Sequence, residues 1–362
     1  MERGELGASV SIWKNGREVV SLARGWRDRD ETQPWTAATP VLVYSVTKSL
    51  AAACVLHVLE KQNLPLETRV AEIWPEFAAA GKSEITIGEA LSHRAGVPAL
   101  DREASVFDHA AVIAALAEQK PLWPRGDGHG YHPRTFGFLL DEIVRRLEGV
   151  TLGEYWRRTF AEPLGLEAWI GLPREKLGEV SPIYAARTAP PDTPFLRAFS
   201  DTDSLTYKAF GSPRGLHAVS AMNTAEARTA SFPGFGGIAT ARALGKFFAL
   251  LANGGELEGE CFFFSETVAL MQSSLSAGFD QVLQMPTAFS AGFMQDPLDA
   301  DGKKMRALFG PSRRAFGQPG AGGSVAFADP ENRVAFAYVM NQMEPGVLPN
   351  PKSLRLIQAI YE

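Results

Sequence analysis

A serine and a lysine three residues apart could carry out acyl transfer in this chain. Ser45 and Lys48 lie at the start of an apolar segment, residues 46–60, whose hydrophobic residues recur at helical spacing and predict one apolar helix face. Residues three apart are neighbours on a helix, so the hydroxyl and the amine come within reach. A weak nucleophile beside a base, at a helix start that favours an oxyanion, is the arrangement that covalent catalysis needs.

The Ser-x-x-Lys spacing is a weak signal by itself. It occurs a second time at Ser11-Ile12-Trp13-Lys14, in an alternating stretch that predicts a strand. Residues three apart on a strand face opposite ways, so Ser11 and Lys14 cannot act together. Ser45 could also be an ordinary helix N-cap beside an unrelated lysine. The segment alone leaves both interpretations of Ser45 open.

Two further segments could form the walls of a site. Tyr131, in Gly130-Tyr131-His132-Pro133, lies on a glycine-flanked loop and could point its phenol into a cleft, or could be an ordinary half-buried tyrosine. The stretch Gly317–Ser324 is rich in glycine, so a backbone N–H there, with Ala321 as the candidate, could approach a ligand closely. A flexible hairpin tip is the alternative for this stretch.

The totals restrict the class of protein. A chain of 362 residues favours two lobes, and 45% hydrophobic residues suffice for a large core. The net charge of 36 minus 41, or −5, argues against nucleic acid and anionic membranes as partners. Only two cysteines are present, Cys54 and Cys261, so a disulfide framework is not expected. Residues 1–5 lack the apolar core of a signal peptide, and no apolar run reaches membrane-spanning length, so we expect a cytoplasmic protein.

Periodicity places strands at both ends of the chain and helices between them. Asn15-Gly16 predicts a tight hairpin turn within residues 7–24. A short strand is expected at 41–44, and helices are expected at 134–147, 151–161, 241–251 and 353–361. Further strands are expected at 289–294, 304–309, 314–318, 324–328 and 333–340. Residues 172–232 show no clear pattern.

This order predicts an α+β fold in which an antiparallel sheet is flanked by helices and a mainly helical lobe is inserted. Residues 1–62 and 226–362 are assigned to the sheet domain, which carries the nucleophile helix. Residues 63–225 are assigned to the helical lobe. The active site is expected in the cleft between the two lobes.

Together, the order and spacing of these segments resemble the serine β-lactamase and penicillin-binding-protein family, in which Ser-x-x-Lys is a known motif. The resemblance is strongest to the family VIII carboxylesterases, and it implies a β-lactamase/DD-peptidase-like fold. The segments that carry it are Ser45-Val46-Thr47-Lys48, Leu91–Gly96, Gly130–Gly137 and Gly317–Ser324.

The resemblance implies a role for each candidate residue. Ser45 would be the acylated nucleophile and Lys48 its base, while Tyr131 would pass protons to the leaving group and help to activate the deacylating water. The N–H groups of Ser45 and Ala321 would form the oxyanion hole. Substrate binding is assigned to Gln318, Gly320 and His132. No cofactor and no metal are expected; His129 and His132 lie three apart but lack further ligands in metal spacing.

Two departures from the family pattern bear on the substrate. Pro133 stands where the family often has an asparagine, and neutral Gln318 stands where β-lactamases have a lysine that binds the substrate carboxylate. We therefore expect neutral esters to be preferred over anionic β-lactams, although Arg313 or Arg314 could restore a positive charge. No Gly-x-Ser-x-Gly segment is present, which argues against an α/β-hydrolase.

The expected function is hydrolysis of short-chain carboxylic esters, with a small-molecule ester as the partner and a monomer or homodimer as the assembly. The alternatives are a β-lactamase or D-amino-acid peptidase, or an inactive binding protein that keeps the fold. Catalysis makes one physical demand, because a free lysine has a pKa of ~10.4 and a base at neutral pH needs one near ~7–8. Lys48 should therefore be buried and should have no carboxylate partner.

Overall fold

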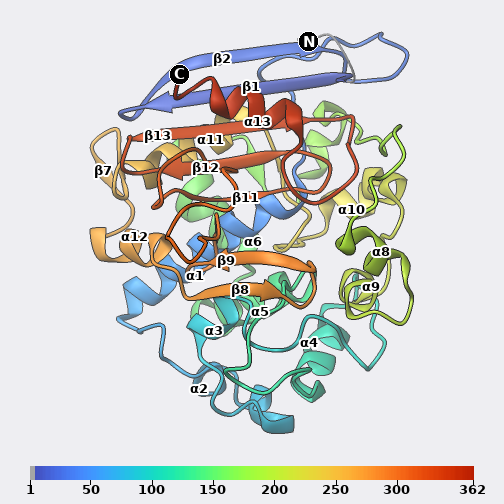
Figure 1. Cartoon of the computed structure of the whole chain (residues 1–362), viewed down its shortest axis with the longest axis vertical. Coiled ribbons are helices and arrows are strands. Elements are labelled where there is room, and N and C mark those ends of the chain that lie inside the picture. Colours follow the sequence, from blue (N-terminus) through green and yellow to red (C-terminus); the bar gives the residue numbers. More distant parts are fainter. Residues whose placement is uncertain (1–4) are drawn as a thin grey trace.

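The computed structural model describes residues 5–362; residues 1–4, within the start that lacks a signal-peptide core, lie outside the described part. An eight-stranded antiparallel sheet dominates it, with strand order β2-β1-β13-β12-β11-β10-β9-β8 (Figure 1). The expected α+β architecture with strands from both ends of the chain is confirmed, because β1 pairs directly with β13.

The strands of the described chain belong to this sheet and to two small ones. They are β1 (Gly7–Lys14), β2 (Arg17–Gly25), β3 (Val41–Leu42), β4 (Ala168–Trp169), β5 (Ile238–Ala239), β6 (Glu256–Leu257), β7 (Glu260–Cys261), β8 (Ser276–Asp280), β9 (Met285–Phe289), β10 (Met294–Gln295), β11 (Phe316–Pro319), β12 (Val325–Asp329) and β13 (Val334–Met340). The predicted first hairpin is confirmed: Asn15 and Gly16 have φ of 51° and 75°, the left-handed conformation that its tight turn requires.

The α-helices cover both faces of the sheet and fill the lower half of Figure 1. They are α1 (Thr47–Gln62), α2 (Val70–Ile73), α3 (Ile87–Leu91), α4 (His109–Glu118), α5 (Thr135–Glu148), α6 (Leu152–Trp156), α7 (Glu162–Leu164), α8 (Pro194–Ser200), α9 (Leu205–Gly211), α10 (Ala225–Thr229), α11 (Ala241–Ala252), α12 (Ser265–Gln272) and α13 (Pro351–Gln358). Within residues 5–362, none is long and apolar enough to cross a bilayer.

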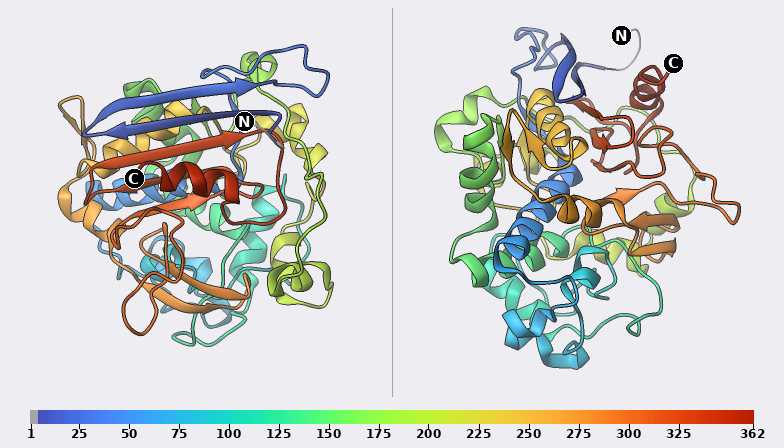
Figure 2. Two further views of the ribbon diagram at one scale, coloured as in Figure 1. Left: turned by 45° about the horizontal axis from the view of Figure 1, so that its top comes forward. Right: turned by 90° about the vertical axis from the view of Figure 1, so that its left-hand side faces the viewer.

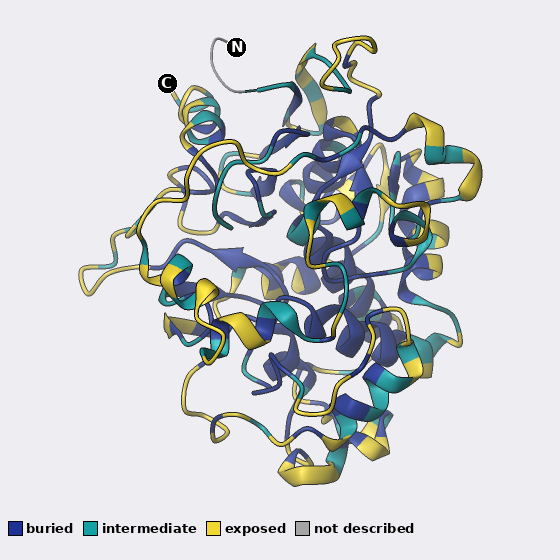
Figure 3. Ribbon diagram, turned by 90° about the vertical axis from the view of Figure 1, so that its right-hand side faces the viewer, coloured by how far each residue is buried: buried dark blue, intermediate teal, exposed yellow. Residues whose placement is uncertain are grey.

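Helix α1 lies at the centre of the molecule. It contacts α5 and α6 on one side and α12 and β11 on others, and α11 covers the sheet beside it. Figure 2 shows α13 on the opposite face of the sheet from α11. The expectation of a single apolar face on α1 is wrong, because the helix buries residues around most of its circumference. Figure 3 shows the ribbon at the centre of the molecule as mostly buried. Small residues such as Ala51 and Ala52 allow this close packing.

Two other expectations differ from the structure. The strand expected at residues 304–309 is absent from the described chain: the buried Asp296 carboxylate accepts hydrogen bonds from the Leu308 and Phe309 N–H groups and the Lys304 amine, which hold this segment as a loop. The helix expected at 151–161 is confirmed, with one irregularity: it continues from α6 through a π turn at Arg157–Ala161 into α7. The strand expected at 289–294 falls on the turn between β9 and β10, and β8 and most of β9 were not predicted.

The poorly patterned region 172–232 contains short helices. Helices α8 and α9 pack against each other through Phe195, Phe199 and Phe210, whose ring centroids lie 5.4–5.8 Å apart. The division into a sheet domain and a helical lobe stays a prediction, since one buried apolar cluster runs through both parts.

Candidate active site

Ser45 is presented by a strained turn at the start of α1. Tyr44 has φ of +44°, a conformation that tyrosine rarely adopts, and a 3₁₀ turn at Tyr44–Val46 leads into the helix. The segment is held from two sides: the Val43 N–H donates to Gly237 O at 2.9 Å, and a Cβ added to Gly320 would lie 2.3 Å from Val43 O. Only glycine therefore fits at position 320, and the turn cannot relax away from the site.

Lys48 meets the demand placed on a base. Its side chain is 0% exposed, and its Nζ lies 3.3 Å from Ser45 Oγ, 2.7 Å from Pro133 O and 2.7 Å from Gly234 O. No carboxylate of residues 5–362 forms an ion pair with it. Burial lowers the pKa of the Lys48 amine well below its usual value.

The bonding directions around Lys48 Nζ are compatible with a neutral amine that acts as a base. A neutral amine carries two N–H donors and one lone pair. The carbonyls of Pro133 and Gly234 accept both N–H bonds, so the remaining direction, occupied by the lone pair, faces Ser45 Oγ. The Ser45 hydroxyl can then donate its proton to Lys48, as an activated nucleophile requires.

Tyr131 approaches the same pair from the other side. Its hydroxyl accepts a bond of 3.2 Å from Gln318 Nε2, and its ring centroid lies 4.8 Å from Lys48 Nζ. Burial raises the pKa of the Tyr131 phenol, so it stays protonated. The nearby Ser45 hydroxyl acts to lower the pKa of the phenol. Because Gln318 donates to the phenol oxygen, the phenol proton is left to be donated toward the reacting atoms.

The glycine-rich turn between β11 and β12 faces the nucleophile. Gly320 N donates to Ser324 O at 2.7 Å, which closes the turn and leaves Ala321 beside Ser45 on the wall of a cavity. Within the described chain, neither the Ser45 nor the Ala321 N–H donates to a protein acceptor. Both donors are thus free to meet a developing oxyanion.

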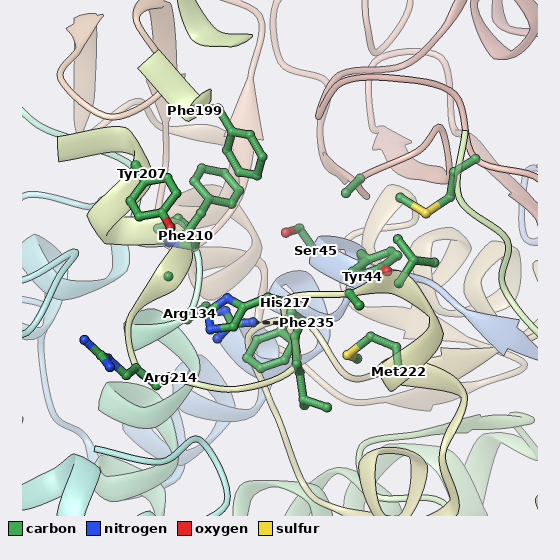
Figure 4. A pocket seen from close by; sticks show the side chains of 17 residues that line it. Tyr44, Ser45, Arg134, Phe199, Tyr207, Phe210, Arg214, His217, Met222 and Phe235 are labelled. Carbon is green, nitrogen blue, oxygen red and sulfur yellow. Dashed lines mark hydrogen bonds between the residues drawn. The ribbon is translucent and has the colours of Figure 1, made fainter. Parts of the chain in front are cut away.

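The cavity above Ser45 has a volume of about 640 Å³ and an apolar, aromatic wall. Figure 4 shows Ser45 between the rings of α8 and α9 on one side and Tyr44 and Met222 on the other. Its lining residues are Tyr44, Ser45, Pro133, Arg134, Phe199, Tyr207, Phe210, Gly211, Arg214, Leu216, His217, Ala218, Val219, Met222, Phe235, Ala321 and Met343.

The two arginines of this wall already have partners. The Arg134 guanidinium donates to the carbonyl oxygens of Pro213, Gly215 and Leu216. Arg214 forms an ion pair with Glu103. Both guanidinium groups keep their positive charge, but each is already bonded to a protein partner.

Comparison with known proteins gives the family. The Beta-lactamase family model matches residues 1–359. The chain belongs to the beta-lactamase family. It is 30% identical to the esterase/beta-lactamase LipL of Mycobacterium tuberculosis over 348 residues, which cover 93% of this chain and 77% of LipL.

Solved structures of this family have the same fold. A penicillin-binding-protein homologue from Caulobacter crescentus is 35% identical with a TM-score of 0.88, covering 99% of this chain and 92% of its own. A family VIII carboxylesterase is 32% identical with a TM-score of 0.88 and the same coverage. The fold is thus the β-lactamase/penicillin-binding-protein fold that the sequence resemblance implied.

One predicted substrate contact is wrong. His132 is 0% exposed; its Nδ1 bonds Gly130 O at 2.7 Å and its Nε2 accepts from Val97 N at 3.0 Å. Burial lowers its pKa to about 3, so the ring is neutral, and it links the Tyr131 loop to Val97. It supports that loop and does not line the cavity.

The other predicted residues lie together, but not all of them line the cavity. Gln318 contacts Tyr131 and Gly320 contacts Val43, both from behind the wall, so their contact with substrate stays a prediction. Arg313 and Arg314 are exposed and lie outside the cavity lining, so they do not replace the missing lysine.

Sequence reasoning missed the Gly234 carbonyl and the aromatic wall. Gly234 belongs to a close-packed turn, because a Cβ on Gly137 would lie 2.1 Å from Gly234 N. The same close approach places Gly234 O within hydrogen-bond distance of Lys48 Nζ. The glycines of residues 233–237 could have suggested such an approach.

Proposed function

We propose that this protein is a serine carboxylesterase that hydrolyses short-chain esters through an acyl-enzyme on Ser45. The observation that carries the proposal is the environment of Lys48: a buried amine with both N–H directions fixed by carbonyls and the third direction facing Ser45 Oγ. An amine in these surroundings is a base at neutral pH, whereas one paired with a carboxylate would not be.

The proposed reaction follows from the positions of the groups. Ser45 Oγ attacks the ester carbonyl carbon while Lys48 takes the hydroxyl proton, and the carbonyl oxygen, now negative, binds the N–H groups of Ser45 and Ala321. The C–O bond to the alcohol breaks, and Tyr131 donates a proton to the leaving oxygen, with Lys48 restoring that proton. Water then attacks the acyl carbon, giving up a proton to the same pair, and releases the acid and free Ser45.

The lining of the cavity favours neutral, apolar substrates. Its wall is mostly aromatic and aliphatic, and its arginines are engaged by backbone carbonyls and by Glu103. Gln318 donates a hydrogen bond to Tyr131 where a β-lactamase lysine would bring a charge. The similarity to a family VIII carboxylesterase points to the same substrate class.

Cleavage of β-lactams or of D-amino-acid peptides is the second candidate. The relative LipL is described as both esterase and beta-lactamase, and the Caulobacter crescentus relative as a penicillin-binding-protein homologue. The same nucleophile and base would serve an amide, so substrate recognition separates the two activities. An inactive binding protein is disfavoured, because burying an amine without an ionic partner costs stability that binding alone would not require.

The decisive experiment compares Ser45→Ala with a matched control. Ser49 lies one residue beyond Lys48 on α1, is fully buried and has no hydrogen-bond partner for its hydroxyl. We expect Ser45→Ala to abolish hydrolysis of p-nitrophenyl acetate and butyrate, and Ser49→Ala to retain it. Intact mass spectrometry of the wild type with a fluorophosphonate should show one adduct, absent in Ser45→Ala. Unchanged turnover in Ser45→Ala would refute the proposal, and faster turnover of nitrocefin than of esters would favour the second candidate.

A further inference from the structure

Asp280 is a fully buried carboxylate that the proposed reaction does not use. It ends β8, is 0% exposed, and both its oxygens accept from the Tyr131 N–H, at 3.0 and 3.1 Å. Its Oδ1 also accepts from the N–H groups of Val282 and Leu283 at 2.9 and 2.8 Å. A carboxylate inside the protein is expensive unless it is bonded in this way, so its presence needs an explanation.

Two neighbouring side chains, Thr287 and His129, fix the orientation of Asp280. The Thr287 hydroxyl lies 3.1 Å from Asp280 Oδ2 and 2.7 Å from His129 Nε2. A carboxylate only accepts, so Thr287 donates to Asp280 and in turn accepts from the Nε2–H of His129. Burial is the main effect on His129 and lowers its pKa, which keeps the ring neutral in this tautomer. The hydrogen bonds are therefore donated in one direction, from His129 to Thr287 and from Thr287 to Asp280.

This hydrogen-bond network ends at Tyr131, the proton donor of the proposed reaction. The Tyr131 N–H lies at the base of the residue whose hydroxyl lies near Ser45 and Gln318. Asp280 and Tyr131 are 149 residues apart in sequence, and within the described chain Asp280 is the side chain that fixes the Tyr131 backbone N–H. A shift of about 1 Å at a catalytic group can cost about 10²-fold in rate, so this anchor bears on chemistry as well as folding.

The charge of Asp280 acts on the phenol as well. Burial contributes most to the raised pKa of Tyr131, and the negative charge of Asp280 raises it further. The same turn also reaches the aromatic wall, because Thr206 Oγ1 of α9 donates to Val282 O at 2.6 Å. One carboxylate thus contacts the backbone of the proton donor and orders the turn that anchors α9.

We propose that Asp280 is a positioning residue for Tyr131: its carboxylate fixes the Tyr131 backbone, so that the phenol is held where it delivers its proton to the departing alkoxide. The inference rests on the proposed function, since it assigns Asp280 to the leaving-group step of that reaction. In this step the C–O bond to the alcohol breaks, its electron pair goes to the alcohol oxygen, and the proton comes from Tyr131 Oη.

Leaving-group dependence tests this role. p-Nitrophenolate leaves readily without a proton, whereas ethoxide needs one, so kcat/KM should be measured for p-nitrophenyl butyrate and ethyl butyrate in parallel. General-acid catalysis contributes about 10²–10⁴-fold, so Tyr131→Phe should lose that much on the ethyl ester and far less on the p-nitrophenyl ester. Asp280→Asn should show the same selective loss, at least about tenfold, and add little in the Tyr131→Phe background, because both act on one step.

A matched control separates positioning from folding. Asp296 is also buried and also accepts backbone N–H bonds and a side-chain donor, but it lies outside the cavity lining. Asp296→Asn should lower the melting temperature without changing the ratio of the two kcat/KM values. Thr287→Val removes only the hydroxyl next to Asp280, and should give a smaller selective loss on the ethyl ester even if Asp280→Asn does not fold.

The outcomes are distinct. If Asp280→Asn and Thr287→Val reduce both esters equally while Tyr131→Phe is selective, Asp280 is only structural and the inference is overturned. If Tyr131→Phe is itself not selective, Tyr131 does not protonate the leaving group and the inference also falls, while Ser45 can still be the nucleophile. Failure of the proposed function would appear differently, as undiminished turnover in Ser45→Ala.

Discussion

Replacing Lys48 with methionine separates what the amine does for catalysis from what it costs the fold. Methionine keeps a similar length but carries no proton and no charge. In the unfolded chain the lysine has its ordinary pKa of ~10.4, so holding it neutral at pH 7 costs about 4.6 kcal/mol at 1.36 kcal/mol per pKa unit. The folded protein bears this cost because burial lowers the pKa of the Lys48 amine well below its usual value.

The substitution also removes favourable contacts. The carbonyls of Pro133 and Gly234 each lose a bond of 2.7 Å, and an unsatisfied buried acceptor costs about 1–3 kcal/mol. The stability gained by avoiding deprotonation and the stability lost with the two hydrogen bonds are of similar size. The stability of Lys48→Met at a single pH therefore does not show whether Lys48 is neutral. The pH dependence of the free energy of unfolding does show it, because residue 48 takes up a proton on unfolding only when it is lysine.

The direction of this pH dependence follows from the number of protons bound in the folded and unfolded states. Between the lowered folded pKa and ~10.4, the unfolded wild type binds one more proton than the folded state, so its free energy of unfolding rises with pH by about 1.4 kcal/mol per unit. Lys48→Met lacks this contribution. The difference between the two free energies of unfolding, measured with urea, should therefore shift in favour of the wild type between pH 7 and pH 9, by up to about 2.7 kcal/mol when the folded pKa lies below 7. Other titrating groups cancel in the difference.

A flat difference over this range would mean that Lys48 stays charged in the folded protein, and would remove the base from the proposed mechanism. Activity gives a parallel measurement. Since the neutral amine is the active form, kcat/KM of the wild type should rise with pH through the lowered pKa of Lys48. Lys48→Met should have almost no esterase activity at any pH.

Three further substitutions test the surroundings of the nucleophile. Gln318→Leu removes the donor to Tyr131 Oη, and we expect about a tenfold loss in kcat with little change in KM, by steady-state kinetics, from one lost buried hydrogen bond. Gly320→Ala places a Cβ 2.3 Å from Val43 O, and should destabilise by about 1–3 kcal/mol in urea unfolding and lower kcat. Phe199→Ala removes a ring from the cavity wall; kcat/KM should fall about tenfold for p-nitrophenyl butyrate but little for the acetate, and equal losses would contradict an apolar acyl site.

The sequence predicted the reacting side chains better than their surroundings. Ser45 and Lys48 share one helical turn, so their spacing alone brings them together. The acceptors that hold the Lys48 amine are backbone oxygens of Pro133 and Gly234, and backbone atoms carry no residue signature. His132 was misassigned because its neighbour Tyr131 faces the site, while its own ring turns inward to Gly130 and Val97.

The aromatic wall and Asp280 could not be predicted for a different reason. Helices α8 and α9 have seven residues each, too short for a periodic pattern to emerge from the surrounding loops. Asp280 ends β8, a five-residue strand with exposed residues at its centre, and its partner Tyr131 lies far away in sequence. Such contacts depend on tertiary packing, which a single sequence does not display.

The carbonyls that hold Lys48 come from segments 85 and 186 residues further along the chain. Before those segments arrive, the lysine is an ordinary solvated ammonium and the serine beside it an ordinary alcohol. A nascent or partly denatured chain therefore carries an inert nucleophile. On the proposed mechanism, reactivity therefore arises only once the tertiary structure is complete.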